Sequence, residues 1–217
     1  MREIVGLADT VEFDMTYLQK AGLLTIVCLI LATPPGWAVQ LKPLSLPQLS
    51  QGAGIIFEGE CVAIRTGQDA ESGFIATWYT FNVLECLKGK TGETVTIKQY
   101  GGSDGKITVH APITSYQVGE RVILFLYAQS KIGFTSCVGI SQGKFAVREF
   151  EDREGRFVTN GMPAKVLFEG LDRVIPTYDS KGIQTQGAER LRSANLDKDN
   201  FVSMVRTLVK DQELKTN

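Results

Sequence analysis

Hydrophobic and polar residues follow three different patterns along this chain, and each pattern predicts a different kind of element. An unbroken apolar run covers residues 21–33. Between residues 55 and 150, short apolar or alternating segments are separated by polar stretches that contain glycine. After Asp197, apolar side chains recur at the spacing of a helix. The chain therefore divides into an N-terminal leader, a β-rich domain and a C-terminal helix.

Six segments of the middle region are rich in the β-branched and aromatic residues that strands favour. The segment 121–127 is nearly all apolar, as a central strand buried on both faces requires. The predicted strands cover residues 55–64, 75–87, 94–100, 121–127, 132–138 and 144–150. Short strands at such intervals predict a mainly β domain over residues 52–170, built as a small barrel or sandwich.

Polar segments between the strands are predicted to be turns and loops. Residues 66–73 form a polar loop, and the glycines of 88–92 favour a tight turn. The charged stretch 149–156 indicates an exposed turn or hairpin tip. Residues 39–51 contain two prolines and are predicted to be an extended lead-in to the domain.

The C-terminal part changes character. Residues 171–196 are polar and are interpreted as a loop or linker. Asp197 is then predicted to cap a helix over residues 197–213. Its apolar side chains fall on one face, at Phe201, Val202, Val205, Leu208 and Val209. A stripe this narrow on a charged helix indicates packing against the helix's own domain rather than against a partner.

The apolar run near the N-terminus has the length of a signal-peptide core. Residues 21–33 would span about 20 Å as a helix, whereas bilayer hydrocarbon is about 30 Å thick. The Pro-Pro-Gly of residues 34–36 ends the helix, and small residues at Gly36 and Ala38 suit cleavage after Ala38. Residues 1–38 are therefore predicted to be a signal peptide, and the protein to be secreted or periplasmic.

The first fourteen residues are acidic, whereas a signal peptide begins with a basic segment. A chain that starts at Met15 would have a short basic start ending at Lys20. Met15 is therefore an alternative start to Met1. A buried core helix and an uncleaved membrane anchor are the two other interpretations of the apolar run.

Charge excludes two classes of partner. The chain has 217 residues with a formal net charge of −1. Removing residues 1–38 takes away two basic and four acidic side chains, which leaves a net charge of about +1. Nucleic-acid-binding proteins normally carry a strong basic excess, and anionic membranes attract polybasic runs. We therefore expect neither nucleic acid nor a membrane surface as partner, and no membrane span after the leader is removed.

Three cysteines remain after the leader, which itself contains Cys28: Cys61, Cys86 and Cys137. An exported protein permits one disulfide among these three, with one thiol left free. All three lie in apolar, strand-like segments, so buried thiols are an equal alternative. Cys-x-x-Cys spacing does not occur, and neither a redox motif nor a zinc knuckle is indicated.

Three segments of the chain resemble strands of the netrin-like domain, which is the OB-like barrel shared with tissue inhibitors of metalloproteinases. The segments are residues 57–62, 78–89 and 118–126. The second fits the family pattern of alternating apolar residues followed by Lys-Gly, with Tyr79, Phe81, Val83, Lys88 and Gly89. The resemblance covers residues 52–150. It implies an OB-like barrel of five to six strands and a protein-binding or accessory role.

One departure from that family matters for function. Metalloproteinase inhibitors of this kind begin with Cys-x-Cys, which chelates the zinc of the protease. The mature chain here would begin at Val39 and has no cysteine before Cys61. Zinc-chelating inhibition is therefore not carried over. The resemblance implies the barrel and a binding role alone.

Candidate catalytic residues are few. His110 is the only histidine, so any Ser-His-Asp or Cys-His site would have to use it. Glu58, Glu60 and Glu85 could pair as acid and base in a glycosidase-like cleft. Carboxylates on the polar face of a strand and a histidine in a loop are more often solvated. We therefore predict no catalytic residues and no enzyme.

Two further segments superficially resemble ligand loops. Residues 195–200 resemble the start of a calcium loop, but Asn200 replaces the required glycine and Arg206 the required glutamate. A helix cap is the better interpretation. Residues 101–105 are glycine-rich but lack the Lys-Ser/Thr of a phosphate loop, so they are predicted to be a turn. We expect neither metal nor cofactor.

Three hypotheses for function follow. The preferred one is an exported, non-enzymatic binding or accessory protein whose target is an extracellular or envelope protein. The second is a hydrolase of unrecognised type that uses His110 and carboxylates. The third is a structural protein of the cell envelope. An exposed apolar patch would favour the first or third, and a pocket that unites His110 with carboxylates would favour the second.

Overall fold

The computed structural model describes residues 41–150, 153–171 and 196–216. Several predictions lie outside the described residues, namely the signal peptide 1–38, its alternative start Met15, its cleavage after Ala38, and residues 172–195 of the linker. Within the described part, every helix is too short or too polar to cross a membrane.

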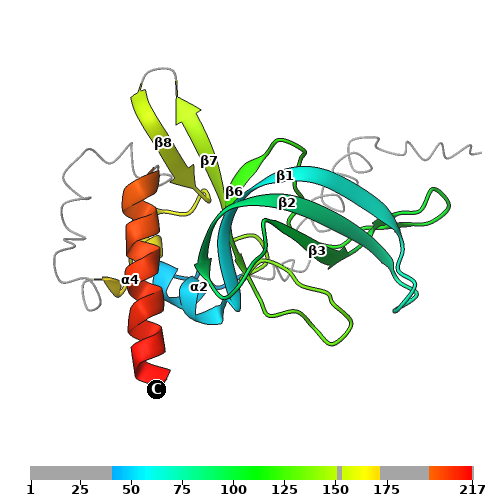
Figure 1. Cartoon of the computed structure of the whole chain (residues 1–217), viewed down its shortest axis with the longest axis horizontal. Helices are drawn as coiled ribbons and strands as arrows, with labels where there is room; N and C mark the ends of the chain where they lie inside the picture. Colours follow the sequence, from blue (N-terminus) through cyan, green and yellow to red (C-terminus); the bar gives the residue numbers. More distant parts are fainter. Residues whose placement is uncertain (1–40, 151–152, 172–195, 217) are drawn as a thin grey trace, which may run out of the picture. The chain divides into compact units, whose positions relative to one another are not determined.

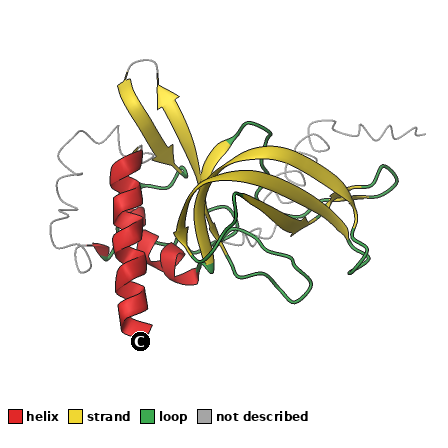
Figure 2. Ribbon diagram, viewed as in Figure 1, coloured by secondary structure: helices red, strands yellow, loops and turns green. Residues whose placement is uncertain are grey.

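The described chain is built on one antiparallel sheet of seven strands, in the order β3-β2-β1-β6-β7-β8-β9 (Figure 1). The strands are β1 (Ile55–Gln68), β2 (Ile75–Lys88), β3 (Thr94–Tyr100), β6 (Arg121–Leu126), β7 (Lys144–Phe150), β8 (Arg153–Thr159) and β9 (Leu196–Asp197). A separate two-stranded sheet pairs β4 (Gly102–Ser103) with β5 (Thr108–Val109). The prediction of a mainly β fold with a C-terminal helix is confirmed (Figure 2).

The long hairpin of β1 and β2 is strongly bent. Register shifts interrupt its ladder between Ile56 and Phe57, between Glu58 and Gly59, and between Cys61 and Ala63. Such shifts increase the local twist of a strand. At Gly59, a Cβ atom would lie 2.8 Å from the carbonyl oxygen of Asn82, so only glycine fits there. The bend lets the hairpin curve over an interior.

The central strand β6 is buried on both faces, as the sequence predicts. Ile123 and Phe125 belong to one hydrophobic cluster, and Val122, Leu124 and Leu126 belong to another. The sheet therefore has two cores that share their central strands, because successive side chains of a strand point to opposite faces.

The inner core lies between the curved strands and is rich in aromatic rings. Phe57, Tyr79, Phe81 and Tyr116 meet edge to face at centroid distances of 4.8–5.7 Å. Such contacts stabilise an aromatic cluster beyond its buried area. The predicted alternation of β2 is confirmed, since Tyr79 and Phe81 are buried in this core and Val83 packs against it.

The outer core is covered by helices α2 (Leu46–Gly52), α3 (Ala164–Leu167) and α4 (Lys198–Thr216). All five apolar positions of the predicted helical stripe are buried there, namely Phe201, Val202, Val205, Leu208 and Val209. The Phe201 ring lies 4.7 Å from that of Phe145. The prediction that the C-terminal helix packs on its own domain is confirmed, and α4 lies beside α2 (Figure 1).

The extended lead-in predicted over 39–51 is wrong for its second half, because residues 46–52 form α2. The Gln48 side chain accepts a hydrogen bond from the Ser45 N–H at 3.0 Å, one half of a capping box. Pro47 lies in the first turn, where a helix tolerates proline. The prediction took this proline as a sign against a helix.

The Lys-Gly element of the family resemblance holds α2 in place. Lys88 Nζ donates to the carbonyl oxygen of Ser50 at 2.6 Å, and burial lowers the pKa of this amine. Gly89 has φ +80°, and a Cβ atom there would lie 3.0 Å from the Gly54 carbonyl oxygen. Both residues of this element thus have structural roles.

Two strand predictions differ from the structure, and the prediction for the charged stretch holds. The strand β1 continues to Gln68 into the predicted loop 66–73, since it pairs with β2 along its whole length. The hairpin predicted for the charged stretch 149–156 is confirmed, because β7 and β8 pair with each other across it. Residues 132–138 form a turn with isolated bridges instead of a strand.

Ladder pairing does not close this sheet into the five- to six-stranded barrel that the resemblance implies. The sheet has seven strands, with β3 and β9 at its two edges. Two isolated bridges still connect residues 134–138 to other strands, Phe134 with Lys98 of β3 and Cys137 with Leu126 of β6. The chain after β6 thus lies beside the β3 edge.

Candidate functional site

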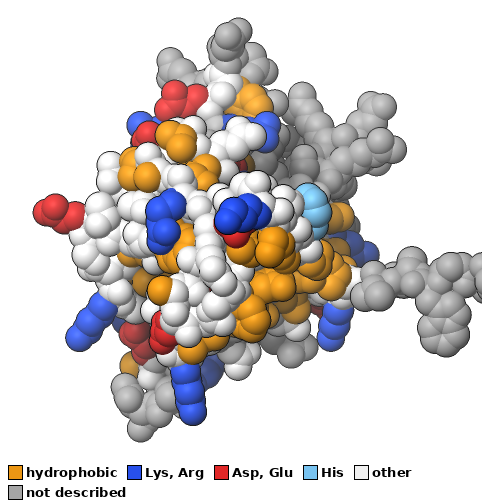
Figure 3. Space-filling view, turned by 90° about the vertical axis from the view of Figure 1, so that its right-hand side faces the viewer, with side chains coloured by type: hydrophobic (Ala, Val, Ile, Leu, Met, Phe, Trp, Pro, Cys, Tyr) orange, Lys and Arg blue, Asp and Glu red, His pale blue; other side chains and the backbone are white. Residues whose placement is uncertain are grey.

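Two hollows on the described surface differ in character. One is a groove of about 480 Å³ with a mostly apolar lining, and the other is a charged pocket of about 520 Å³. The groove is lined by Phe74, Tyr100, Ile113, Tyr127, Ala128, Ser130, Ile132, Phe134, Thr135 and Ser136. Hydrophobic side chains gather into a patch on the side of the molecule where the β1–β2 turn lies (Figure 3).

The turn between β1 and β2 positions Phe74 at one wall of the groove. Asp69 closes this turn, because its N–H donates to the Phe74 carbonyl oxygen at 2.7 Å. The Asp69 carboxylate also accepts bonds from the Ser72 hydroxyl at 2.6 Å and the Ser72 N–H at 3.0 Å. These bonds, together with Lys98, hold the pKa of Asp69 below its usual range.

Lys98 of β3 contacts residues of both walls of the groove. Its amine lies 3.0 Å from the Asp69 carboxylate, 3.5 Å from that of Glu71, and 4.7 Å from the centre of the Phe134 ring. Only about a tenth of the Lys98 and Asp69 side chains is exposed. A buried cation of this kind requires carboxylate partners. The pair therefore connects the β1–β2 turn to the segment around Phe134.

The segment after β6 forms the opposite wall and is held by its own hydrogen bonds. The Tyr127 N–H donates to Ser136 at 3.0 Å, and the Ser130 N–H donates to Phe134 at 2.8 Å. The Thr135 hydroxyl donates to the Tyr127 carbonyl oxygen at 2.7 Å, and its N–H donates to Lys98 at 2.9 Å. The backbone of this wall is thus held by hydrogen bonds within the protein itself.

Four large apolar side chains of the groove are exposed to solvent by about 38–51% of their area: Phe74, Tyr100, Tyr127 and Ile132. The rings of Phe74 and Tyr100 meet edge to face at 5.7 Å. Aromatic residues are enriched in the contact areas of protein partners, because they bury a large area at small entropic cost. This surface can therefore bind an apolar segment of another molecule.

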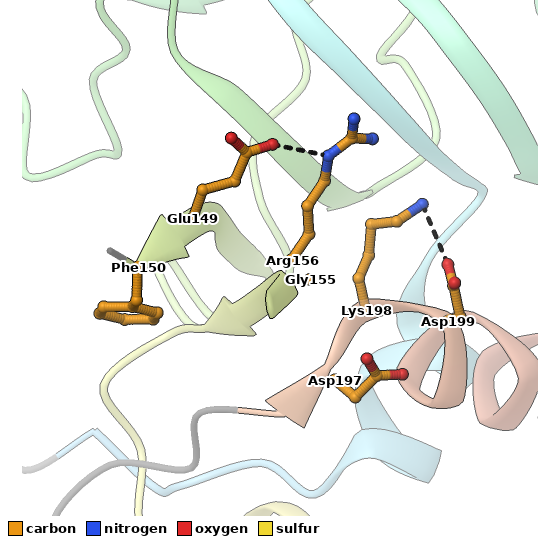
Figure 4. A pocket seen from close by; sticks show the side chains of 7 residues that line it. All are labelled: Glu149, Phe150, Gly155, Arg156, Asp197, Lys198 and Asp199. Atoms are coloured by element: carbon orange, nitrogen blue, oxygen red, sulfur yellow. Dashed lines mark hydrogen bonds and ion pairs between the residues drawn. The ribbon is translucent and has the colours of Figure 1, made fainter. Parts of the chain in front are cut away.

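The charged pocket lies where the β7–β8 hairpin meets the start of α4 (Figure 4). Arg156 is paired with Glu149 at 2.9 Å, and Lys198 lies 3.4 Å from Asp199. Asp197 Oδ1 accepts the Asn200 N–H at 2.9 Å. The pocket's charged groups are thus engaged with one another or with the helix end. Across the described chain, no three His, Cys, Asp or Glu side chains lie close enough together to hold a metal ion.

Glu58 is buried, which corrects the expectation that strand carboxylates would be solvated. Its side chain is 2% exposed and accepts from Arg121 of β6 at 2.6 Å and from Lys198 of α4 at 3.2 Å. A carboxylate at this depth needs such partners. Glu58 therefore anchors the helix to the sheet and lines neither hollow.

Glu60 and Glu85, the other two candidate carboxylates, do not form an acid–base pair with Glu58. Glu85 is the ladder partner of Glu58, but its carboxylate pairs with Arg206 of α4. Glu60 is exposed. The predicted trio thus consists of two helix anchors and one solvated side chain.

His110 lies exposed in the loop after β5. Within the described chain no hydrogen bond joins it to a carboxylate, hydroxyl or thiol, and it lines neither hollow. The structure therefore does not bring the predicted hydrolase residues together.

Each of the three domain cysteines is a free thiol. Cys61 and Cys137 are buried in the inner core, whereas Cys86 is exposed on β2. Burial raises the pKa of Cys61, and it raises that of Cys137 to about 11. The Tyr116 hydroxyl lies 3.1 Å from Cys137 Sγ, and its own pKa is raised by burial. The interpretation as buried thiols thus holds for Cys61 and Cys137 and is wrong for Cys86, which is exposed.

The described residues of the two segments that resemble ligand loops, 195–200 and 101–105, form the helix cap and the turn that the sequence favours. Asp197 caps α4 through the Asn200 N–H, as predicted. In the glycine-rich stretch, the Asp104 carboxylate accepts from the N–H groups of Lys106 and Ile107 at 2.8 and 2.7 Å. These bonds lower the Asp104 pKa and close a turn.

Sequence reasoning missed the groove, because its walls come from four separated stretches of chain. Only the wall that contains Phe74 had a signal in the local sequence. Asp69 followed by Ser72 and Gly73 is a turn signature that would have placed Phe74 at a fixed point. Nothing local links Tyr100 to Tyr127.

A comparison with models of known protein families and with curated protein sequences finds no match.

Proposed function

We propose that this protein is an exported, non-enzymatic binding or accessory protein, and that the apolar groove contacts an extracellular or envelope protein. The observation that carries the proposal is the set of exposed aromatic side chains on a hydrogen-bonded frame. Phe74, Tyr100 and Tyr127 each expose close to half of their area. Solvation of such a patch is unfavourable, and apolar patches of this kind mark contact surfaces.

Export is part of this proposal and rests on the sequence of the leader. Residues 21–33 have the length of a signal-peptide core, and Ala38 suits cleavage. Mass spectrometry of the protein from its native host should give a mature N-terminus near Val39. Recovery of cytosolic protein with an intact Met1 or Met15 would contradict export.

An OB-like, netrin-like barrel is the fold proposed for the inner strands. Residues 134–138 support it, because they contact β3 on one side and β6 on the other. The Thr135 N–H donates to Lys98 and the Val138 N–H donates to Phe125, both at 2.9 Å. In hydrogen exchange, the Thr135 and Val138 amides should be protected like those of β6, whereas an open sheet would leave them as fast as Lys131.

The binding function is tested by capture with matched variants. The exported protein is immobilised and incubated with the extracellular or envelope fraction of its host, and retained proteins are identified by mass spectrometry. Tyr100→Ala should abolish retention of the specific partner, because it removes a groove wall. Leu84→Ala is the control, since Leu84 is 49% exposed on β2 outside the groove. A partner retained equally by both variants would refute the groove as the site.

A further inference from the structure

The lining of the groove carries no charge. None of its ten lining residues is an Asp, Glu, Lys, Arg or His. Lys98, whose amine lies 4.7 Å from the centre of the Phe134 ring, already has two carboxylate partners, at 3.0 and 3.5 Å. A charged side chain docked here would lose its hydration without gaining a counter-ion. Charge complementarity therefore selects an uncharged segment.

The hydrogen-bonding groups of the groove are unequally available. The carbonyl oxygens of Phe74, Tyr127, Ser130, Phe134 and Ser136 each already accept a hydrogen bond from the protein itself. The Tyr127 hydroxyl accepts from the Gly139 N–H at 3.3 Å, which leaves its own hydrogen free to donate. Tyr100 adds a second hydroxyl at 46% exposure. The groove thus offers two tyrosine hydroxyl donors, while five of its ten backbone carbonyl oxygens are engaged.

A partner segment with ordinary peptide N–H groups needs an acceptor for each N–H that it buries, and an N–H left unpaired costs free energy. Proline has no N–H but keeps a carbonyl acceptor. Proline-rich segments also form the extended polyproline II helix, whose rings pack into aromatic-lined grooves at low entropic cost. Both properties match a groove with aromatic walls and hydroxyl donors.

Resting on the proposed function above, we infer that the groove binds a proline-rich, uncharged segment of its partner protein in the polyproline II conformation. Aromatic rings of Phe74, Tyr100 and Tyr127 receive the proline rings. The tyrosine hydroxyls donate to carbonyl oxygens of the segment.

The test is an NMR titration of the ¹⁵N-labelled exported protein with a capped peptide of ten prolines. We expect saturable shifts confined to residues around the groove. Tyr100→Ala should weaken the affinity about tenfold, as loss of an aromatic anchor does. Tyr100→Phe keeps the ring and removes the hydroxyl, so it should weaken the affinity about threefold. Leu84→Ala should leave it unchanged within twofold.

A capped ten-residue Gly-Ser peptide is the control ligand and should cause no shifts at the groove. Equal binding of the two peptides, or no groove shift with decaproline, would overturn the inference. The capture experiment separates this failure from failure of the proposed function. A partner lost with Tyr100→Ala but without affinity for proline peptides would leave the binding function intact while excluding a proline-rich segment.

Discussion

At the residue scale, two glutamates of the central hairpin determine how the C-terminal helix is attached. Glu58 and Glu85 are partners in the β1–β2 ladder, so their side chains leave the same face of the sheet. Lys198 and Arg206 of α4 meet them there. The charged side of the helix thus contributes to docking, although its apolar stripe alone predicts the packing.

Replacing Glu58 by Gln should destabilise the fold by about 3 kcal/mol, because Arg121 would lose its carboxylate partner and Lys198 would keep only the exposed Asp199. The free energy of unfolding is measured by urea denaturation. Glu60→Gln on the same strand is the matched control, and this exposed residue should change stability by no more than about 0.5 kcal/mol. Equal effects of the two variants would contradict a buried anchor.

The three thiols of the domain should differ sharply in reactivity. Cys86 is exposed, whereas Cys137 is buried with a pKa of about 11. At pH 8 the thiolate of Cys137 is therefore populated on the order of one part in a thousand. Iodoacetamide labelling followed by peptide mass spectrometry should modify Cys86 first, and Cys61 and Cys137 only in denaturant. A disulfide between any two of them in the exported protein would contradict this order.

At the element scale, α4 is a structural part of the domain because its apolar face completes the outer core. Phe201 contacts the rings of Phe125 on β6 and Phe145 on β7. Val205 and Leu208 are buried in the same cluster as Leu46 and Leu49 of α2. Helical periodicity places these residues on one face, but burial is what stabilises the helix.

Truncating Phe201 to Ala should cost about 3–5 kcal/mol, through lost burial and the cavity left beside the rings of Phe125 and Phe145. Leu214→Ala on the same helix is the control, since Leu214 is 71% exposed. That control should change the free energy of unfolding by no more than about 0.5 kcal/mol. Similar losses in both variants would show that α4 does not pack as described.

At the scale of the whole molecule, the two cores cannot unfold separately, because the same strands build both. On β1, Ile56 faces the outer core and Phe57 the inner one. On β6, Ile123 and Leu124 divide in the same way. Loss of either strand from the sheet would expose both clusters at once.

We therefore expect a single cooperative unfolding transition. Fluorescence of Trp78 on the β1–β2 hairpin and the helical signal in far-ultraviolet circular dichroism should have the same midpoint. Phe81→Ala in the inner core and Phe201→Ala in the outer core should both lower that one midpoint. Two separate transitions, with each variant affecting only its own, would contradict the shared architecture.

Strong local patterns predicted most elements correctly. The strand over 94–100 has the predicted bounds, and the α4 stripe is buried at every predicted position. The failures have local causes as well. Pro47 lies in the first turn of α2, and its presence led to the prediction of an extended segment. The apolar segment 132–138 forms a turn whose backbone bonds to Ser130, to Lys98 of β3 and to Phe125 of β6.

The sequence by itself determined the β-rich class, the capped helix after Asp197 and the expectation of export, because each depends on residues close together in the chain. Only the tertiary structure decided that Glu58 is a buried anchor and that Phe74, Tyr100 and Tyr127 share one groove. The physical reason is that burial and charge pairing depend on which distant strands become neighbours, and that follows from the fold of the whole chain.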